Sequence, residues 1–277
     1  MVTNWHLIVL AILQGITELF PVSSLGHAVL VPALLHWPMN RDAPWFLPFI
    51  VVLHLGTAAA LLLFFWRDWR DILASLVRTR GRPTEPDARL FWLLVLGTVP
   101  AGLIGLALHH QIRLLFGTLT VAAVALAING ILLIAGDALR HRRPRYELER
   151  MNWRQSFLIG IAQALALIPG ISRSGVTLIA GVGTGLDYAA SARFSFLLAT
   201  PIIGAAGLLE VPKLLHASVP HGLFMTIIGS GIVAGICAWL STWFLMRYFR
   251  LREVTALRPF GVYCLLAAGT ALLLHFL

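Results

Sequence analysis

The stretch LQGITELFPVSSLGH at residues 13–27 decides the fold, together with its later counterpart AQALALIPGISRSGVT at residues 162–177. Each stretch interrupts a long apolar region with proline, glycine and serine. Irregular backbone inside a bilayer is tolerated only where it is buried in protein or lines a polar cavity, because each unsatisfied amide costs several kcal/mol. The two interruptions are therefore expected to face each other or water inside a membrane protein.

The composition identifies lipid as the natural solvent of the chain. Of its 277 residues, 58% are hydrophobic and 12% are charged, against about 45–50% and about 25% in soluble domains. Helices in the apolar stretches would be long enough to cross about 30 Å of hydrocarbon. The expected fold is an all-α polytopic integral membrane protein with full spans at residues 46–66, 90–108, 118–138, 190–211, 222–246 and 259–277.

The net charge of +9 raises the question of nucleic-acid binding. Sixteen of the 21 lysines and arginines fall in three short segments, at residues 67–89, 139–155 and 247–258. Basic clusters between apolar spans are typical of cytoplasmic loops that face anionic lipid. The charge therefore predicts three cytoplasmic loops and argues against nucleic acid as a partner.

The parity of crossings between these loops predicts a re-entrant hairpin. The residues between 139–155 and 247–258 begin and end on the cytoplasmic side, so the number of crossings between them is even. The spans 190–211 and 222–246 supply two crossings, so the segment 156–187 must return to the face from which it enters. By the same parity, the segment 5–37 is either a second re-entrant hairpin that enters from outside or two full crossings.

The two interrupted segments look like versions of one unit. In each, a glutamine precedes apolar residues, a proline follows and a serine lies three positions later, namely Gln14, Pro21 and Ser24 against Gln163, Pro169 and Ser172. Each unit is followed by three spans, so the second half would be inserted upside down, as in inverted-topology repeats. We expect a first half at 1–138 and a second half at 156–277, joined by a cytoplasmic basic linker at 139–155.

The polar groups at the interruptions favour a phosphate ligand. Glu18, His27 and Arg173 are ionisable groups at membrane depth, where burial is costly and function is the default interpretation. Serines, glycines and a guanidinium at a helix start suit an anion, since free N–H groups and the helix dipole point at it. Glu18 and Gln14, one helical turn apart, supply oxygens for a hard divalent cation, Mg²⁺ or Ca²⁺, that would bridge protein and diphosphate.

Other polar residues carry weaker signals. Most of the remaining histidines are expected to be structural, and His54, within an apolar run, is left unassigned. Cys237 and Cys264 show neither metal-ligand nor redox spacing. The candidate chemistry is therefore concentrated at the two interruptions.

These motifs resemble the undecaprenyl-diphosphate phosphatases associated with bacitracin resistance. QGITELFPVSSLGH is similar to the family's acidic motif with its PVSS-x-GH continuation, and PGISRSGVT is similar to its second signature. The resemblance runs nearly end to end and implies removal of the terminal phosphate of undecaprenyl diphosphate, which yields the carrier used in peptidoglycan synthesis. It also implies a divalent metal and a bacterial cytoplasmic (inner) membrane protein whose site opens toward the periplasm, and it allows a homodimer.

Carried over by position, the resemblance implies catalytic roles for Glu18, Ser24, His27 and Arg173. Arg173 would bind the diphosphate, Ser24 or a water would attack phosphorus, and His27 would be the general base, the acid or even the nucleophile. The substrate-binding residues would be Gln14, Ser23, Gly26, Ser172, Ser174, Gly175 and Thr177, with a metal held by Glu18 and Gln14.

One position departs from the family pattern, because Gln14 stands where an acidic residue is commoner. An amide can hold a cation or a water but cannot act as a base, so Glu18 must supply the local negative charge. A rival interpretation is a lipid-phosphate or anion transporter, because inverted repeats around a midplane anion site also describe carriers. A nucleophile, a base and a carboxylate beside one phosphate clamp favour an enzyme, since transport needs only the clamp.

Overall fold

The computed structural model describes residues 4–39, 43–108, 110–111, 118–140, 146–215, 221–252 and 255–276. This part of the chain is helical and contains no named strand. The centre of the predicted linker, 141–145, lies outside the described residues. The α-helices are α1 (Asn4–Thr17), α2 (Ser24–Leu34), α3 (Phe46–Phe64), α4 (Trp66–Arg78), α5 (Pro86–Ala107), α7 (Leu119–Arg140), α8 (Trp153–Gln163), α9 (Arg173–Gly183), α10 (Tyr188–Leu215), α11 (His221–Leu251) and α12 (Arg258–Phe276), with 3-10 helices η1 (Leu148–Arg150) and η2 (Ala164–Leu167).

Five helices of the described residues are long and apolar enough to cross a membrane, namely α3, α5, α7, α11 and α12. The further long helix α10 covers the sixth predicted span. The chain is therefore a multi-pass, all-α membrane protein, which confirms that part of the predicted fold class. α5 begins earlier than predicted, at Pro86, because proline at the first helical position sacrifices no intrahelical hydrogen bond.

Each interrupted segment forms two short helices joined at a polar loop. α1 and α2 flank the loop 18–23, while α8 with η2 and α9 flank the loop 168–172. At about 1.5 Å per residue, the 14 residues of α1 span about 21 Å, which is less than the hydrocarbon thickness. For the segment 5–37, this length favours a re-entrant hairpin over two full crossings.

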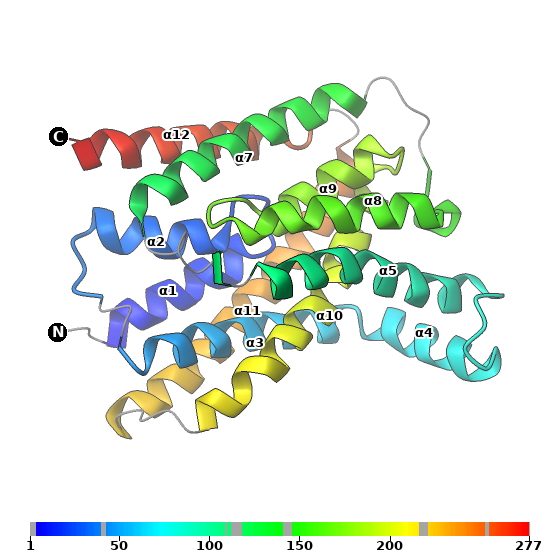
Figure 1. The fold of residues 1–277 in the computed structure, drawn as a ribbon, viewed down its shortest axis with the longest axis horizontal. Helices are drawn as coiled ribbons and strands as arrows, with labels where there is room; N and C mark the ends of the chain where they lie inside the picture. Colours follow the sequence, from blue (N-terminus) through cyan, green and yellow to red (C-terminus); the bar gives the residue numbers. More distant parts are fainter. Residues whose placement is uncertain are drawn as a thin grey trace.

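The helices pack in pairs that correspond between the two predicted halves (Figure 1). α1 of the first hairpin packs on α11, and α8 of the second hairpin packs on α5. α3 packs on α10, and α7 packs on α12. A two-fold relation between the halves would produce this exchange of partners. The division into halves stays a prediction with which the packing agrees.

Close backbone contacts hold the tips of the hairpins together. A Cβ atom at Gly26 would lie 3.3 Å from the Cα atom of Gly170. Gly170 has a φ of +106°, which side chains rarely adopt, and a Cβ atom there would overlap the carbonyl oxygen of Ala122 in α7. A larger residue at Gly170 would therefore push the second loop away from α7.

The basic segment 67–89 contains a helix, α4, that the charge pattern does not predict. Ile72 is fully buried on its inner face. Arg78 donates a hydrogen bond to Glu85 at 2.8 Å, which lowers the pKa of the Glu85 carboxyl group. Asp68 accepts from Arg193 of α10 at 2.6 Å. This segment is therefore an ordered part of the fold that an ion pair joins to α10.

Candidate active site

Glu18 forms the centre of the first loop. It directly follows α1, and only 9% of its surface is exposed. Its Oε2 atom accepts hydrogen bonds from Gln14 Nε2 at 3.1 Å and from Ser24 Oγ at 2.6 Å. Gln14 lies one turn earlier on α1, and Ser24 is the first residue of α2. Three of the predicted site residues therefore meet at one carboxylate oxygen.

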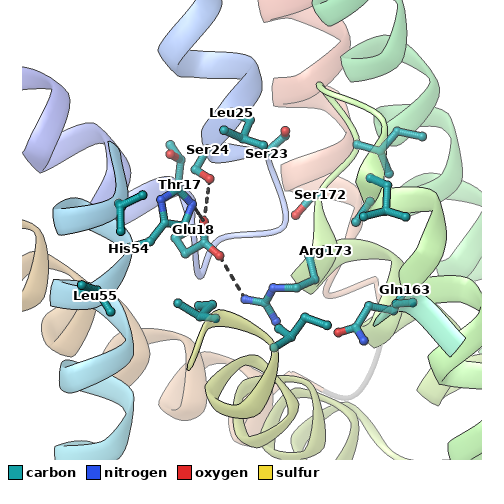
Figure 2. A pocket seen from close by; sticks show the side chains of 17 residues that line it. Thr17, Glu18, Ser23, Ser24, Leu25, His54, Leu55, Gln163, Ser172 and Arg173 are labelled. Carbon is teal, nitrogen blue, oxygen red and sulfur yellow. Dashed lines mark hydrogen bonds and ion pairs between the residues drawn. The ribbon is translucent and has the colours of Figure 1, made fainter. Parts of the chain in front are cut away.

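Arg173 brings the second loop to the same carboxylate. It is the first residue of α9 and directly follows the helix cap Ser172. Its Nη2 atom donates to Glu18 Oε1 at 3.2 Å, and its Nη1 atom donates to the carbonyl oxygen of Ser195 at 3.4 Å. The close-up in Figure 2 shows the pair bridging the two loops. Because both side chains are largely buried, solvent screens this pair little.

The two loops contain matching helix caps. Ser23 accepts a hydrogen bond from the N–H group of Gly26 at 3.3 Å at the start of α2. Ser172 accepts one from the N–H group of Gly175 at 3.1 Å at the start of α9. The caps fix two helix N-termini at the site, and helix N-termini favour anions.

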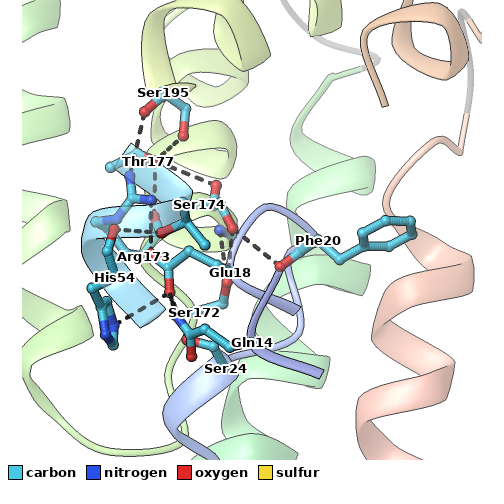
Figure 3. A network of polar contacts seen from close by, with 12 residues as sticks. Gln14, Glu18, Phe20, Ser24, His54, Ser172, Arg173, Ser174, Thr177 and Ser195 are labelled. Carbon is cyan, nitrogen blue, oxygen red and sulfur yellow. Dashed lines mark hydrogen bonds and ion pairs between the residues drawn. The ribbon is translucent and has the colours of Figure 1, made fainter. Parts of the chain in front are cut away.

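Hydroxyl groups of α9 hold the second loop in place (Figure 3). Ser174 Oγ donates to the carbonyl oxygen of Phe20 at 3.2 Å and lies 3.0 Å from Ser172 Oγ. Thr177 Oγ1 lies 2.6 Å from Ser195 Oγ on α10. The structure thus places Ser174 and Thr177 in a network that supports the loops.

Asn129 of α7 joins the tips of both hairpins, a position that the sequence analysis missed. Its Nδ2 atom donates to the carbonyl oxygen of Pro21 at 2.9 Å, and its Oδ1 atom accepts from the N–H group of Ser172 at 3.0 Å. Asn129 is fully buried. A single polar amide within an otherwise apolar span is the signal that would have identified it.

A cavity of about 290 Å³ lies beside the Glu18–Arg173 pair. Its polar side chains come from the two hairpins and from α3, and its remaining walls are apolar. The polar lining is Thr17, Glu18, Ser23, Ser24, His54, Gln163, Ser172 and Arg173, and the rest is Leu25, Val51, Leu55, Ala101, Ala166, Leu167, Ile171, Ile202 and Ile203. Apolar cavities with a few convergent polar groups are typical ligand sites, and this one suits a ligand with an anionic head and an apolar chain.

His27, on α2, contacts the first loop and α12. Its Nδ1 atom is 2.7 Å from the carbonyl oxygen of Ser23, and its Nε2 atom is 2.7 Å from the hydroxyl group of Tyr263 on α12. His27 is buried and is not among the residues that line the cavity. Both ring nitrogens therefore have protein partners, and the structure does not bring His27 to Glu18. Its predicted role as acid, base or nucleophile stays a prediction.

His54 of α3 is the imidazole that lies beside Glu18. Its Nδ1 atom is 2.9 Å from the carbonyl oxygen of Ile50, and its Nε2 atom is 3.7 Å from Glu18 Oε2. It lines the cavity. The sequence analysis left it unassigned because a histidine within an apolar run has no spacing relative to either motif.

Comparison with known proteins places the chain in a family. Residues 7–270 match the family described as bacitracin resistance protein BacA. The chain belongs to this family. Undecaprenyl-diphosphatase 2 of Chromobacterium violaceum is 56% identical over 263 residues, which are 95% of each chain. The undecaprenyl-diphosphatases of Acidiphilium cryptum and Granulibacter bethesdensis are 52% and 50% identical, over 96% of each chain in the first and 97% of this chain in the second.

The donor atoms of this BacA-family site suit a cation that shares its ligands with phosphate. Glu18, Gln14 and Ser24 carry oxygen atoms, the ligand type that Mg²⁺ and Ca²⁺ prefer. Within the part of the chain that the structure describes, no group of three or more His, Cys, Asp or Glu side chains could hold a metal. Among these three side chains Glu18 is the one carboxylate, so the residues fit a cation that takes its other ligands from phosphate and water.

Proposed function

We propose that this protein hydrolyses undecaprenyl diphosphate to undecaprenyl phosphate and inorganic phosphate. The observation that carries the proposal is the meeting of Glu18, Ser24 and Arg173 at the polar end of a cavity with apolar walls. Relatives about half identical over nearly the whole chain are named undecaprenyl-diphosphatases, which supports the same activity here. The product would be recycled as the lipid carrier for peptidoglycan synthesis, and the activity would give bacitracin resistance.

Arg173 and the two helix N-termini bind the diphosphate in this proposal. A guanidinium can grip phosphate with two parallel hydrogen bonds, and the N–H groups at the starts of α2 and α9 add donors. The apolar walls from α3, α5, η2 and α10 take the first part of the isoprenoid chain. The same donors offset the charge that develops on the transferring phosphoryl group.

Ser24 is the nucleophile of the proposed reaction. Its hydroxyl group donates to Glu18 Oε2 at 2.6 Å, the reach that a nucleophile needs to its base. Ser24 Oγ bonds to the terminal phosphorus, the bond from phosphorus to the bridging oxygen breaks, and the proton of Ser24 passes to Glu18. Water then hydrolyses the phosphoserine. Direct attack by water on the diphosphate is the alternative that substitution of Ser24 tests.

A divalent cation, Mg²⁺ or Ca²⁺, would be held by Glu18 and Gln14 together with the diphosphate. When bound, it would offset negative charge on the phosphates. The protein's own contribution is to hold these two side chains together, because Gln14 donates to Glu18.

The site belongs, in this proposal, to a bacterial cytoplasmic membrane and opens toward the periplasm. The three basic segments 67–89, 139–155 and 247–258 mark the cytoplasmic side by the positive-inside rule. Parity then places both ends of the first hairpin, α1 and α2, on the opposite side. The lipid diphosphate would therefore enter from the external leaflet.

Phosphate release from undecaprenyl diphosphate by the detergent-purified protein, with and without EDTA, tests the proposal. Metal-dependent release is expected from the wild type, with losses of at least about 100-fold in Glu18→Ala and Arg173→Ala. Arg78→Ala is the matched control, because Arg78 forms an exposed ion pair with Glu85 outside the cavity. If folded wild-type protein releases no phosphate in Mg²⁺ or Ca²⁺, the enzyme is excluded and lipid-phosphate transport in vesicles becomes the next assay.

A further inference from the structure

Gln163 contributes a buried amide to the cavity that the chemistry above does not use. It is the last residue of α8, and 2% of its surface is exposed. Its Nε2 atom donates to the carbonyl oxygen of Gly97 on α5 at 3.2 Å. Its Oε1 atom is buried and has no hydrogen-bond partner among the described residues. Figure 2 shows the amide end of this side chain on the Arg173 side of the cavity.

The orientation of the Gln163 amide follows from its neighbours. Rotating the amide by half a turn would place Oε1 against the carbonyl oxygen of Gly97, and two acceptors repel. The oxygen therefore points away from the Gly97 carbonyl, and Gln163 is one of the residues that line the cavity. Leaving a buried carbonyl oxygen without a donor costs free energy, so a donor that enters the cavity and reaches Oε1 would be bound there.

The chemistry of the reaction narrows what that donor is. The phosphate oxygens of the substrate are acceptors and would be repelled by Oε1. Arg173 has five N–H groups. Two of them donate to Glu18 and to Ser195, and the others are those that the proposed function assigns to the diphosphate. Water is the reactant that can donate one hydrogen to the amide oxygen while its lone pair points at phosphorus.

We propose that Gln163 is a water-positioning residue, whose Oε1 atom holds the water that attacks phosphorus. This inference rests on the proposed phosphatase function. In the hydrolytic step, the water oxygen bonds to phosphorus and the bond from phosphorus to Ser24 Oγ breaks. One water proton passes to Ser24 Oγ, the other stays on the released phosphate, and Glu18 returns its earlier proton to solvent. A direct attack on the diphosphate would need the same held water.

Three variants separate this role from helix packing. Gln163→Leu removes both polar atoms at similar volume, whereas Gln163→Glu keeps an acceptor and loses the donor to Gly97. Ser156→Ala is the matched control, because Ser156 also joins α8 to α5, by donating to the carbonyl oxygen of Leu93 at 2.5 Å, but does not line the cavity. Size-exclusion profiles and thermal unfolding in detergent establish that each variant is folded.

The measurements are kcat and KM for phosphate release, and the ratio of methyl phosphate to inorganic phosphate in added methanol. We expect Gln163→Leu to lower kcat about tenfold with little change in KM. Gln163→Glu should lower kcat less than Gln163→Leu, because it keeps an acceptor for water, and should raise KM, because its negative charge repels the diphosphate. Methanol has one O–H group and cannot donate both to Gln163 and to a proton acceptor, so the wild type should discriminate against it. Gln163→Leu should raise the methyl phosphate ratio, and Ser156→Ala should leave it unchanged.

Two results would overturn the inference while the phosphatase function stands. One is equal loss in Gln163→Leu, Gln163→Glu and Ser156→Ala with an unchanged methanol ratio, which would assign Gln163 to helix packing. The other is a shift in the Mg²⁺ concentration for half-maximal activity in Gln163→Leu, which would make Oε1 a cation ligand. Wild-type protein without phosphate release would overturn the proposed function and this inference together.

Discussion

The two hairpins use one backbone plan to place opposite charges at one point. In each, a serine caps the second helix, and the next residue carries the functional group: Ser23 precedes Ser24, and Ser172 precedes Arg173. The first loop adds the carboxylate of Glu18, which the guanidinium of the second loop contacts at 3.2 Å. The backbone thus brings two helix N-termini together, while in our proposal the side chains decide which tip binds the anion and which accepts the proton.

The glutamines of the two hairpins also differ, in the groups to which their amides donate. Gln14 donates its amide to Glu18 inside its own hairpin at 3.1 Å. Gln163 lines the cavity and donates to Gly97 of the neighbouring helix α5 at 3.2 Å, and its buried oxygen has no hydrogen-bond partner among the described residues. Residues at similar places in two related units thus serve a carboxylate in one case and, in our proposal, a water in the other.

The largest difference between the hairpins should appear at the serines. Ser24→Ala should lower kcat about 10³-fold or more, because it removes the proposed nucleophile, and Ser24→Cys should keep part of the activity. Ser172→Ala should change kcat only a few-fold, since Ser172 accepts from Gly175 as a helix cap. Phosphate release under saturating substrate measures all three. Full activity in Ser24→Ala would exclude attack by its side chain.

Neutralising the charges that join the hairpins should give the next largest effect. Glu18→Gln or Arg173→Gln alone leaves a buried charge without its partner, at a cost of about 3–5 kcal/mol in stability. The double variant should recover most of that stability and yet stay about 10²-fold less active, because the phosphate clamp is gone. Thermal unfolding and phosphate release on the same samples separate the two effects.

The more exposed pair between Arg193 and Asp68 provides the control for this experiment. Because Arg193 is 36% exposed, Arg193→Gln should cost no more than about 1 kcal/mol. If the double variant at Glu18 and Arg173 regained activity along with stability, the ion pair would be structural and the clamp would lie elsewhere.

Much of this arrangement follows from the sequence, and the exceptions have physical reasons. Parity predicts a re-entrant hairpin at 156–187 and leaves 5–37 open between a hairpin and two full crossings, because it depends only on hydrophobicity and basic loops. The loop motifs predict Glu18 and Arg173, because charges at membrane depth are rare. The family and the multi-pass membrane fold are confirmed, while the hairpin topology and the roles of Glu18 and Arg173 stay predictions.

Other features depend on three-dimensional contacts that no local pattern records. The proline spacing pairs Ser24 with Ser172, yet the helix caps pair Ser23 with Ser172, because the second loop contains one more residue after its proline. Asn129 and His54 belong to long spans and reach the site only because α7 and α3 pack beside the loops. Local motifs identify the chemistry, whereas the residues that position it come from distant helices.

Asn129 offers a moderate test of how tightly the hairpins are held together. Asn129→Ala should remove the donor to Pro21 and the acceptor for Ser172, leaving two buried backbone groups unsatisfied. We expect a loss of about 1–3 kcal/mol in stability and about tenfold in kcat, since the loops would no longer be fixed relative to each other. Thermal unfolding and phosphate release measure these effects.

A buried hydroxyl elsewhere controls for general destabilisation by Asn129→Ala. Thr242 on α11 donates to the carbonyl oxygen of Ala238 on its own helix, so Thr242→Val should change activity little. Equal kcat losses in the two variants would mean that Asn129 contributes only to stability and does not position the loops.

The smallest effect should distinguish the two cap serines by backbone conformation. Ser23 has a φ of +66°, whereas Ser172 has a φ of −85°. Alanine at either site removes the cap and should lower the free energy of unfolding by about 1 kcal/mol. Alanine at residue 23 must also adopt a left-handed conformation, which costs about 1 kcal/mol that alanine at residue 172 avoids. Glycine relieves that second cost. The gain in stability from replacing alanine by glycine should therefore be larger at residue 23 than at residue 172, as measured by thermal unfolding. Equal gains at both sites would mean that the positive φ of Ser23 carries no strain, and the hairpins would then differ only in their side chains.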